Sequence, residues 1–512
     1  MPTDCSRRPT RAAGSSVEAC SKGLELRTRP RAGRAVPGTG SVGDDDVMNE
    51  TKPLPDQESI AEALAYFDSY LEFRQVFGRI PGVQAAVFTG GGVALSTAHG
   101  QADVEADVPL TTSHLFRIAS HSKTFTATLI LRLVEAGRLR LDDSAAAHVD
   151  SLAGTVAGTR TVRELLEHAS GLYRDSLNGD FWQLVGPFPD AERLQEILLD
   201  PAAPVIPANE RFKYSNIAYS LLGLIVEAVT GTSYADAVTS GIIDRLGLQD
   251  VGPEYDPHRS NEYAAGYTSL AYARKRSPID HVDTRAMAAA TGFFATASDL
   301  VTYFSAHFFG DERLLSDAGK RQMQHPAWKV ESGETQYGLG LAVTQVGERE
   351  MIGHGGGYPG HITNSVADTH AGLAVSVLTN CIDGPAEALA HACVKLIDLA
   401  GRKPRGDGIG LGRFAGRYAS LWGVIDIALL GGRLYQIHPT AVDPTAEAAE
   451  LVFVDDHTLR VAGGAGFESY GEHYRFTFGS DGEVRSMRGG SATTMYPLAD
   501  YTVPERVVAQ HR

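Results

Sequence analysis

The chain has 512 residues, more than one hydrophobic core usually holds, which predicts two or three domains. Hydrophobic residues make up 43% and charged residues 21%, which is typical of a soluble globular protein. The formal net charge of -16 argues against a large nucleic-acid-binding surface, so we expect no nucleic-acid partner.

The N-terminal stretch, residues 1–47, is rich in Arg, Gly, Ser and Pro and has no hydrophobic period, which predicts disorder. Our hypothesis is that translation begins at Met48. Arg7-Arg8 is not followed by an apolar export segment, and no run approaches the roughly 20 apolar residues of a membrane span. We therefore expect a cytoplasmic protein with no membrane partner.

The four cysteines form no CxxC pair and no Cys/His cluster at zinc spacing. Cys381 and Cys393 lie in apolar stretches and are expected to be buried free thiols. The sequence therefore predicts neither a disulfide framework nor a bound metal ion.

The first elements follow from hydrophobic spacing. Residues 59–77 have a helical period. Two apolar stretches flank Gly90-Gly91-Gly92 and predict a β-hairpin. A helix then carries Ser120 and runs to Gly137, a plausible stop. The middle, about residues 145–285, is expected to be mostly helical and rich in loops, with a strong apolar helix over 219–230 ended by Gly231. A further helix over 300–309 is expected to be capped by Ser298 or Asp299.

A Gly- and Arg-containing segment, residues 401–412, predicts a linker. Beyond it, residues 413–504 contain short alternating strands separated by turn signals at Gly431-Gly432, Asp455-Asp456 and 480–482. Evenly spaced strands of this kind predict a small antiparallel β-barrel.

The first chemically suggestive segment places Ser120 three residues before Lys123. A serine hydroxyl needs a base within hydrogen-bond reach to act as a nucleophile. At the start of a helix these two positions share a face, and the free N–H groups favour developing negative charge. Ser122 is expected to lie on another face and is a poor alternative. S-x-x-K alone occurs by chance in many proteins.

The second segment is Tyr214-Ser215-Asn216. A tyrosine hydroxyl can relay a proton between nucleophile and leaving group, and an asparagine amide can orient a lysine and a substrate carbonyl. Taken alone, the same residues could simply anchor and cap a helix.

The third segment is His354-Gly355-Gly356-Gly357, between two apolar segments that predict strands. Glycines at a strand edge let a substrate approach the backbone closely. The Gly357 N–H is a candidate oxyanion donor beside the Ser120 N–H. Taken alone, this could also be a glycine-rich turn with an incidental histidine.

In order, the three segments resemble the S-x-x-K, Y-x-N and K-T-G or H-x-G set of the class C β-lactamase and penicillin-binding-protein superfamily. Four further stretches resemble that family's segments: LLEHASGL (165–172), TGFFATASDL (291–300), YGLG (337–340) and YPG (358–360). The resemblance covers about residues 60–400.

The resemblance implies an α+β catalytic domain over 55–400, with an antiparallel sheet flanked by helices, a helical lobe and a site in the cleft between them. Ser120 would attack a carbonyl and form an acyl-enzyme, with Lys123 and Tyr214 moving protons. Asn216 and His354 would hold the substrate beside the three glycines. No organic cofactor and no metal is implied, and the expected partner is a small-molecule or peptide substrate.

Two departures from the family pattern bear on substrate. His354 stands where many β-lactamases have Lys, and a neutral imidazole binds a carboxylate less well than an ammonium. Gly355 replaces the Thr or Ser of the K-T-G form, so one carboxylate-binding hydroxyl is missing. Both departures favour family VIII esterases, D-aminopeptidases and peptide acyltransferases over β-lactam hydrolysis.

The barrel after the catalytic domain resembles the lipocalin-like domain of D-aminopeptidases and of penicillin-binding-protein-type thioesterases, both of which recognise a D-residue. Our leading interpretation is a serine hydrolase acting on esters or short peptides and amides, D-residues included. The alternatives are a thioesterase or acyltransferase that releases or cyclises a nonribosomal peptide, a D-alanyl-D-alanine carboxypeptidase or β-lactamase, and a catalytically silent ligand-binding protein. The acyl donor and acceptor, the stereochemical preference and the oligomeric state are left open by the sequence.

Overall fold

The computed structural model describes residues 52–330, 335–408, 410–464, 469–503, 505 and 507. The predicted disorder of residues 1–47, the expected start at Met48 and the thiols of Cys5 and Cys20 lie outside these residues.

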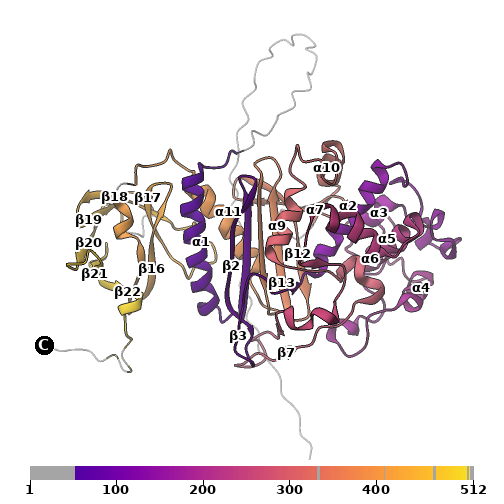
Figure 1. The fold of residues 1–512 in the computed structure, drawn as a ribbon, viewed down its shortest axis with the longest axis horizontal. Helices are drawn as coiled ribbons and strands as arrows, with labels where there is room; N and C mark the ends of the chain where they lie inside the picture. Colours follow the sequence, from indigo (N-terminus) through magenta and orange to yellow (C-terminus); the bar gives the residue numbers. More distant parts are fainter. Residues whose placement is uncertain are drawn as a thin grey trace, which may run out of the picture. The chain divides into compact units, whose positions relative to one another are not determined.

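A nine-stranded antiparallel sheet forms the centre of the catalytic part, in the order β3-β2-β1-β14-β13-β12-β11-β10-β9 (Figure 1). Its strands are β1 (Gly82–Thr89), β2 (Gly92–Asp103), β3 (Val108–Pro109), β9 (Trp328–Lys329), β10 (Gln336–Tyr337), β11 (Ala342–Val346), β12 (Arg349–Tyr358), β13 (His361–Asp368) and β14 (Leu373–Thr379). The predicted β1–β2 hairpin is confirmed: Gly90 and Gly91 form its two-residue turn, both with positive φ (62° and 88°), as such turns require.

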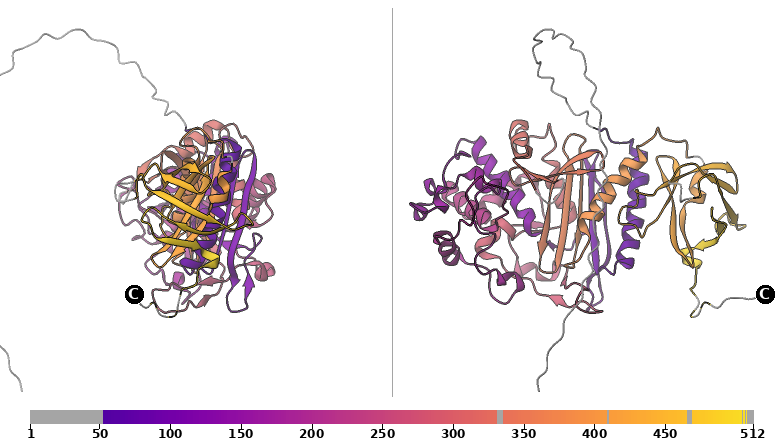
Figure 2. Two further views of the ribbon diagram at one scale, coloured as in Figure 1. Left: turned by 90° about the vertical axis from the view of Figure 1, so that its left-hand side faces the viewer. Right: turned by 180° about the vertical axis from the view of Figure 1, so that it is seen from behind.

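The two faces of this sheet are buried in different cores because side chains alternate along each strand. On β1, Val83 and Val87 pack with the helices α1 (Gln57–Phe77) and α11 (Ala386–Ala400). Ala86, between them, packs with the core around α2 (Ser122–Glu135). The sheet thus separates the α1/α11 layer from the helical lobe, as Figure 1 and the right-hand view of Figure 2 show.

The helical lobe packs around α2, whose residues are mostly buried. Its other elements are α3 (Val162–Leu166), α4 (Ala191–Leu199), α5 (Asn216–Thr230), α6 (Tyr234–Val238), α7 (Asp244–Leu246), α8 (Ala288–Thr291), α9 (Ala297–Ser305) and α10 (Asp317–Gln324). Two small sheets join it, β4 (Phe116–Arg117)-β8 (Phe294–Ala295)-β5 (Val251–Gly252) and β6 (Gly266–Tyr267)-β7 (Pro278–Ile279).

The helix predictions hold in this lobe, with one correction. Gly137 and Gly231 follow α2 and α5 with positive φ, as predicted helix stops do. The cap predicted for the helix near residue 300 is wrong. Thr296 caps α9 by accepting the Asp299 N–H, and the helix ends at Ser305. Asp299 instead accepts the Asp250 N–H at 2.6 Å, a contact between distant segments that local sequence does not predict.

The C-terminal part is a closed eight-stranded antiparallel barrel, which confirms the predicted fold. Consecutive strands pair and the last pairs with the first: β15 (Gly416–Ser420), β16 (Gly423–Leu430), β17 (Arg433–Ile437), β18 (Ala449–Asp455), β19 (Thr458–Val461), β20 (His473–Phe478), β21 (Val484–Arg488) and β22 (Thr494–Pro497). Gly431 and Gly432 form the predicted β16–β17 turn with φ of 60° and 65°. The linker over 401–412 and the domain boundaries stay predictions.

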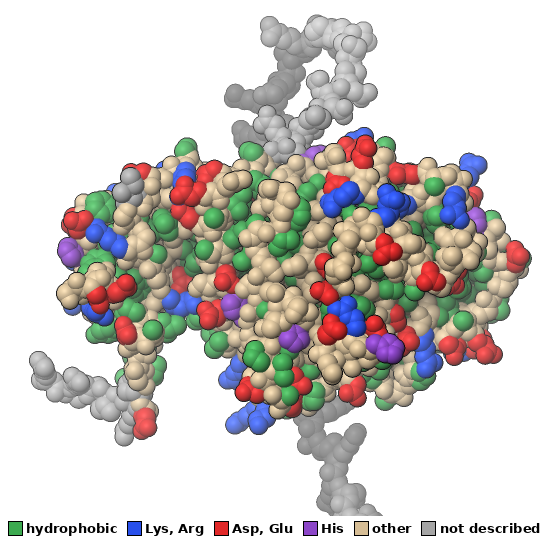
Figure 3. All heavy atoms as spheres, in the orientation of Figure 1, with side chains coloured by type: hydrophobic (Ala, Val, Ile, Leu, Met, Phe, Trp, Pro, Cys, Tyr) green, Lys and Arg blue, Asp and Glu red, His purple; other side chains and the backbone are tan. Residues whose placement is uncertain are grey.

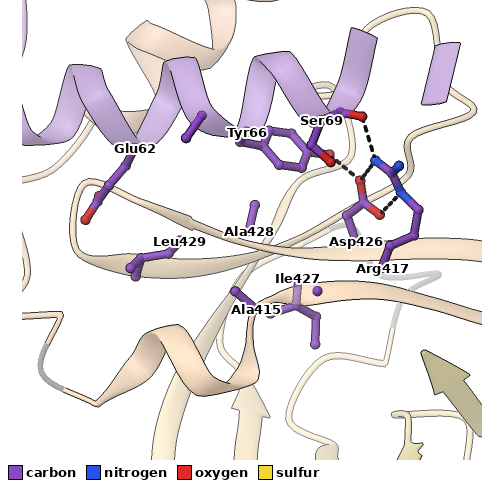
Figure 4. Close-up of a pocket in the computed structure, with 11 residues that line it drawn as sticks. Glu62, Tyr66, Ser69, Ala415, Arg417, Asp426, Ile427, Ala428 and Leu429 are labelled. Atoms are coloured by element: carbon purple, nitrogen blue, oxygen red, sulfur yellow. Dashed lines mark hydrogen bonds and ion pairs between the residues drawn. The ribbon is translucent and has the colours of Figure 1, made fainter. Parts of the chain in front are cut away.

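The barrel packs on α1 around a crevice of about 330 Å³ (Figure 4). At one end of it, Arg417 contacts Asp426 through two hydrogen bonds, from Nε at 2.8 Å and from Nη2 at 2.9 Å. Tyr66 of α1 donates to the same carboxylate at 2.9 Å. Burial and the Asp426 charge raise the pKa of Tyr66, so its hydroxyl stays a donor. The barrel therefore lies against the α1 layer rather than the helical lobe.

Several whole-chain expectations can be compared with the described residues. No single described helix has the length and hydropathy of a membrane span; one bent pair, Asn216–Thr230 with Tyr234–Leu246, meets those criteria only jointly. Cys381 and Cys393 are buried free thiols, as predicted. Within the described segments, no three His, Cys, Asp or Glu side chains are grouped as metal ligands. On the face shown in Figure 3, acidic and basic side chains are interspersed.

Candidate active site

Ser120 lies in a short 3-10 turn, Ala119–His121, that leads directly into α2. Ala119 before it is buried and has a φ of 43°, in the left-handed region that alanine rarely adopts. This strained residue turns the chain from β4 into the helix and leaves Ser120 partly exposed at the helix N-terminus.

Lys123 reaches the same point from the next turn, as the spacing predicts. Its Nζ lies 3.2 Å from Ser120 Oγ and 2.7 Å from the Ala290 carbonyl oxygen. Ser122 points elsewhere: its buried Oγ donates to the Ala119 carbonyl and accepts the Phe293 N–H. The structure therefore places one serine hydroxyl, that of Ser120, beside the lysine amine.

Tyr214 completes the contacts of the Ser120 hydroxyl, because its Oη donates to Ser120 Oγ at 2.8 Å. Its ring packs against that of His168, with the ring planes tilted by 36° and the ring centres 4.2 Å apart. His168 Nδ1 accepts the Ser215 N–H, so this histidine supports the tyrosine segment. Burial lowers the pKa of His168, and the nearby Lys123 charge lowers it further, which keeps the ring neutral.

Burial shifts the pKa values of Lys123 and Tyr214, the two groups beside Ser120, in opposite directions. It lowers the pKa of Lys123 well below its usual value, and the Asp175 charge only partly offsets this. Burial also raises the pKa of Tyr214, against the effect of its bond to Ser120. The amine can therefore be neutral and accept a proton while the phenol remains protonated. A base and a protonated relay group on one hydroxyl suit acyl transfer.

The glycine-rich segment is the end of strand β12, which lies against the Ser120 turn. A side chain at Gly356 would collide with the Ile118 carbonyl and with Thr363 Oγ1. The β12–β13 hairpin closes with Tyr358 opposite His361, and hydrogen-bonded and non-bonded pairs alternate from there. By this alternation Gly357 and Ile362 form a non-hydrogen-bonded pair, so the Gly357 N–H has no partner on β13. It points towards the β11 side of the strand, where the pairing of β12 with β11 extends only as far as Gly353. It is thus available as an oxyanion donor.

His354 is buried, and both of its ring nitrogens are engaged. Nδ1 lies 2.6 Å from the Gly355 carbonyl oxygen and so donates to it, while Nε2 lies 3.1 Å from the Tyr337 hydroxyl and accepts from it. Burial and the Lys123 charge lower the pKa of His354 to about 3. At neutral pH this position therefore carries no positive charge, and substrate binding by His354 stays a prediction.

Asn216 opens α5, where Ser215 caps the helix by accepting the Ala218 N–H. The Asn216 Nδ2 donates to Asp175 Oδ1 at 2.7 Å, and the same carboxylate oxygen accepts the Trp182 indole N–H at 2.8 Å. Sequence reasoning missed Asp175. Its position three residues after Leu172, at the end of the family-like segment 165–172, is the one signal that could have drawn attention to it.

The structure thus brings Ser120, Lys123 and Tyr214 into direct contact, with the glycine strand alongside. The Asn216 amide bonds Asp175 rather than Ser120 or Lys123.

Several known proteins are similar to this chain in sequence or in fold. Penicillin-binding protein 4* of Bacillus subtilis (strain 168) is 29% identical over 289 residues, which are 54% of this chain and 62% of that protein. The match therefore spans less than two thirds of that relative's length.

Two solved structures are similar over nearly their whole length. The octameric penicillin-binding protein homologue from Pyrococcus abyssi has a TM-score of 0.59 at 21% identity, covering 84% of this chain and 99% of that one. The D-amino acid amidase from Ochrobactrum anthropi SV3, solved with D-phenylalanine, has a TM-score of 0.55 at 26% identity, covering 66% and 99%.

The family model described as Beta-lactamase matches residues 67–395, well over half of the chain. That range contains every contact around Ser120, and the sheet, the helical lobe and the serine–lysine pair all lie within it. The chain belongs to the β-lactamase-fold family of serine hydrolases.

Proposed function

We propose that this protein is a hydrolase that forms an acyl-enzyme on Ser120 and cleaves esters and amides of short acyl groups, D-residue amides included. The observation that carries the proposal is the position of Ser120 Oγ, 3.2 Å from the Lys123 amine and 2.8 Å from the Tyr214 hydroxyl. A hydroxyl between a buried base and a proton relay is what acylation of a serine needs.

In the proposed reaction, Ser120 Oγ attacks the substrate carbonyl and its proton passes to the neutral Lys123 amine. The N–H groups of Ser120 and Gly357 stabilise the oxyanion. The proton then passes through Tyr214 to the leaving nitrogen or oxygen as its bond to the carbonyl carbon breaks. In the second half, water attacks the ester and gives a proton to Lys123. Lys123 then returns this proton to Ser120 Oγ as the acyl C–O bond breaks and the acid leaves.

The choice of substrate rests on two observations. A neutral His354 supplies no fixed cation for a substrate carboxylate, which disfavours carboxypeptidase and β-lactam substrates. A relative over the catalytic part, at 26% identity, is named as a D-amino acid amidase.

Intact-protein mass after brief exposure to acyl donors tests the proposal. The donors are a β-lactam, a p-nitrophenyl ester, the p-nitroanilides of D- and L-alanine, and a peptide thioester ending in a D-residue. Wild type should gain the acyl mass from the ester and from an anilide, and Ser120→Ala should gain none.

Ser122→Ala is the matched control, because it removes a neighbouring hydroxyl that faces away from the lysine. It should still be labelled on Ser120. Turnover retained by Ser120→Ala would contradict the proposal.

A further inference from the structure

In the side-chain amide of Asn216, the nitrogen is hydrogen-bonded and the oxygen is not. Its Nδ2 donates to Asp175, but its Oδ1 is buried and accepts no hydrogen bond from any group in the described part of the chain. The residue is only 3% exposed. Leaving a buried acceptor unbonded costs free energy, so native structures rarely do so without a reason. This oxygen is placed to receive a donor that arrives with a ligand.

Asp175 decides which half of the amide is left over. An ionised carboxylate only accepts hydrogen bonds, so it must face Nδ2; a flipped amide would set two oxygens against each other. The carboxylate is itself held by the Trp182 indole N–H at 2.8 Å and by Arg174 Nε at 3.3 Å. An amide at position 175 could pair with either half of Asn216 and would no longer fix its orientation.

Asn216 and Asp175 are each linked to a group that contacts the reacting serine. Asn216 follows Tyr214 by two residues, and the Tyr214 hydroxyl contacts Ser120 Oγ. The Asp175 charge acts on the Lys123 amine and raises its pKa, while Arg174 lowers it. Two residues after the tyrosine that contacts Ser120, the N-terminus of α5 therefore carries an unbonded acceptor, Asn216 Oδ1, and a bonded carboxylate, that of Asp175.

We propose that Asp175 is a positioning residue that makes the site select acyl groups with a free amine next to the reacting carbonyl: esters and amides of amino acids, and peptides with a free N-terminus. The inference rests on the proposed acyl-enzyme at Ser120. A substrate ammonium donates an N–H to Asn216 Oδ1, and the Asp175 charge favours it. An N-acylated substrate has no charge at this nitrogen, and its added carbonyl oxygen lies near Asn216 Oδ1, so that two acceptors face each other. Arg174, 68% exposed in its side chain, can turn into water as the ammonium enters.

The test compares alanine p-nitroanilide with N-acetylalanine p-nitroanilide, which differ only at the amine. A third substrate, p-nitrophenyl propionate, is an ester with no nitrogen at that position and reports on acylation itself. Both enantiomers of the first two are used. Wild type should have a kcat/KM for the free amine at least about 10-fold above that for the N-acetyl compound, the effect of one charge-assisted hydrogen bond.

Asp175→Asn should reduce that ratio about 10-fold, because its amide allows Asn216 to turn its Nδ2 towards an N-acetyl carbonyl. Asp175→Glu restores the carboxylate and should recover part of the preference, which guards against a merely unfolded variant. Glu192→Gln removes a carboxylate from the exposed side of α4 and should keep the wild-type ratio.

A pH profile separates this role from simple support of the fold. Without the Asp175 charge the pKa of Lys123 falls, so the acid limb of kcat/KM for the nitrogen-free ester should move to lower pH. Arg174 then remains as the nearby charge, since His168 and His354 stay neutral.

Equal or faster turnover of the N-acetyl compound by wild type, or an unchanged ratio in folded Asp175→Asn, would overturn the inference. If no substrate acylates wild type, p-nitrophenyl propionate included, the proposed function fails and the inference fails with it.

Discussion

At the scale of single residues, burial converts an ordinary lysine into a base. Lys123 is fully buried, and removing its ammonium from water is the largest cause of its lowered pKa. Its two polar neighbours, Ser120 Oγ and the Ala290 carbonyl, satisfy an amine without supplying a full opposite charge. The same burial that suits catalysis therefore lowers the stability of the fold at any pH where Lys123 is protonated in the unfolded chain, because folding must then remove or bury that charge.

Replacing Lys123 by Met tests this cost through pH. Because the folded pKa lies below 10.5, the unfolded chain holds a proton that the folded chain lacks between the two values, and wild-type stability rises with pH across that window. Lys123→Met lacks this dependence. The unfolding free energy of wild type minus that of the variant should therefore rise with pH from the folded pKa of Lys123 up to about 10.5, by at most about 1.4 kcal/mol per pH unit.

Urea unfolding at several pH values measures this difference. Lys403→Met serves as the control, since the Lys403 ammonium is half exposed and should give no such trend. A flat difference for Lys123→Met would mean that the buried amine is protonated in the folded enzyme.

At the scale of elements, the site depends on how closely one strand approaches one turn. The end of β12 lies against the Ala119–His121 turn, and Gly356 is the residue at which their backbones meet. Gly355 and Gly357 are on the other, exposed side of the strand, where a Cβ would have its nearest neighbour 3.6 Å away. One glycine is thus required by close packing, whereas the other two leave space for a substrate.

Alanine substitutions separate these two roles. Gly356→Ala forces β12 away from Ile118 and should lower the unfolding free energy by about 1 to 3 kcal/mol, the range for overpacking. It should also lower kcat/KM, because the Ser120 turn moves with it. Gly355→Ala adds the same methyl group at ordinary contact distance from its nearest neighbour and should change stability by less than about 0.5 kcal/mol. Thermal unfolding decides: equal losses in both would contradict the packing argument.

Local pattern predicted these elements better than it predicted their contacts. The helical period of residues 59–77 and the glycine pair at 90–91 specify α1 and the first hairpin without help from the rest of the chain. The i, i+3 spacing likewise predicted that Ser120 and Lys123 meet. The bond between Asn216 and Asp175 joins segments 41 residues apart, so no periodicity reports it. The strained φ of Ala119 is imposed by packing and leaves no mark on composition.

At the scale of the whole catalytic and barrel part, two cores lie on opposite faces of the nine-stranded sheet. One contains α2 and the residues around the site; the other contains α1, α11 and barrel residues such as Leu430 and Ile437. A row of α1 side chains at four-residue intervals bonds to the segment after α11 or to the barrel: Glu62, Tyr66, Tyr70 and Arg74. The barrel is therefore joined to the face of the sheet that does not carry Ser120.

This arrangement predicts that the barrel contact can be weakened without loss of chemistry. Asp426 is 2% exposed and takes two hydrogen bonds from Arg417 and one from Tyr66. Asp426→Ala leaves a largely buried guanidinium without its partner and should lower the unfolding free energy by about 3 kcal/mol. The folded variant should keep the wild-type kcat/KM, because the site lies beyond the sheet.

Two further variants identify the cause. Asp481→Ala breaks an ion pair to Arg485 whose side chains are about half exposed, and it should cost less than about 1 kcal/mol. The double variant Asp426→Ala/Arg417→Met removes both buried charges and should recover part of the stability lost by Asp426→Ala alone. Urea unfolding and turnover of one ester are measured on all four proteins. A fall in kcat/KM that accompanies the loss of stability would show that the barrel reaches the chemistry through α1 and the sheet.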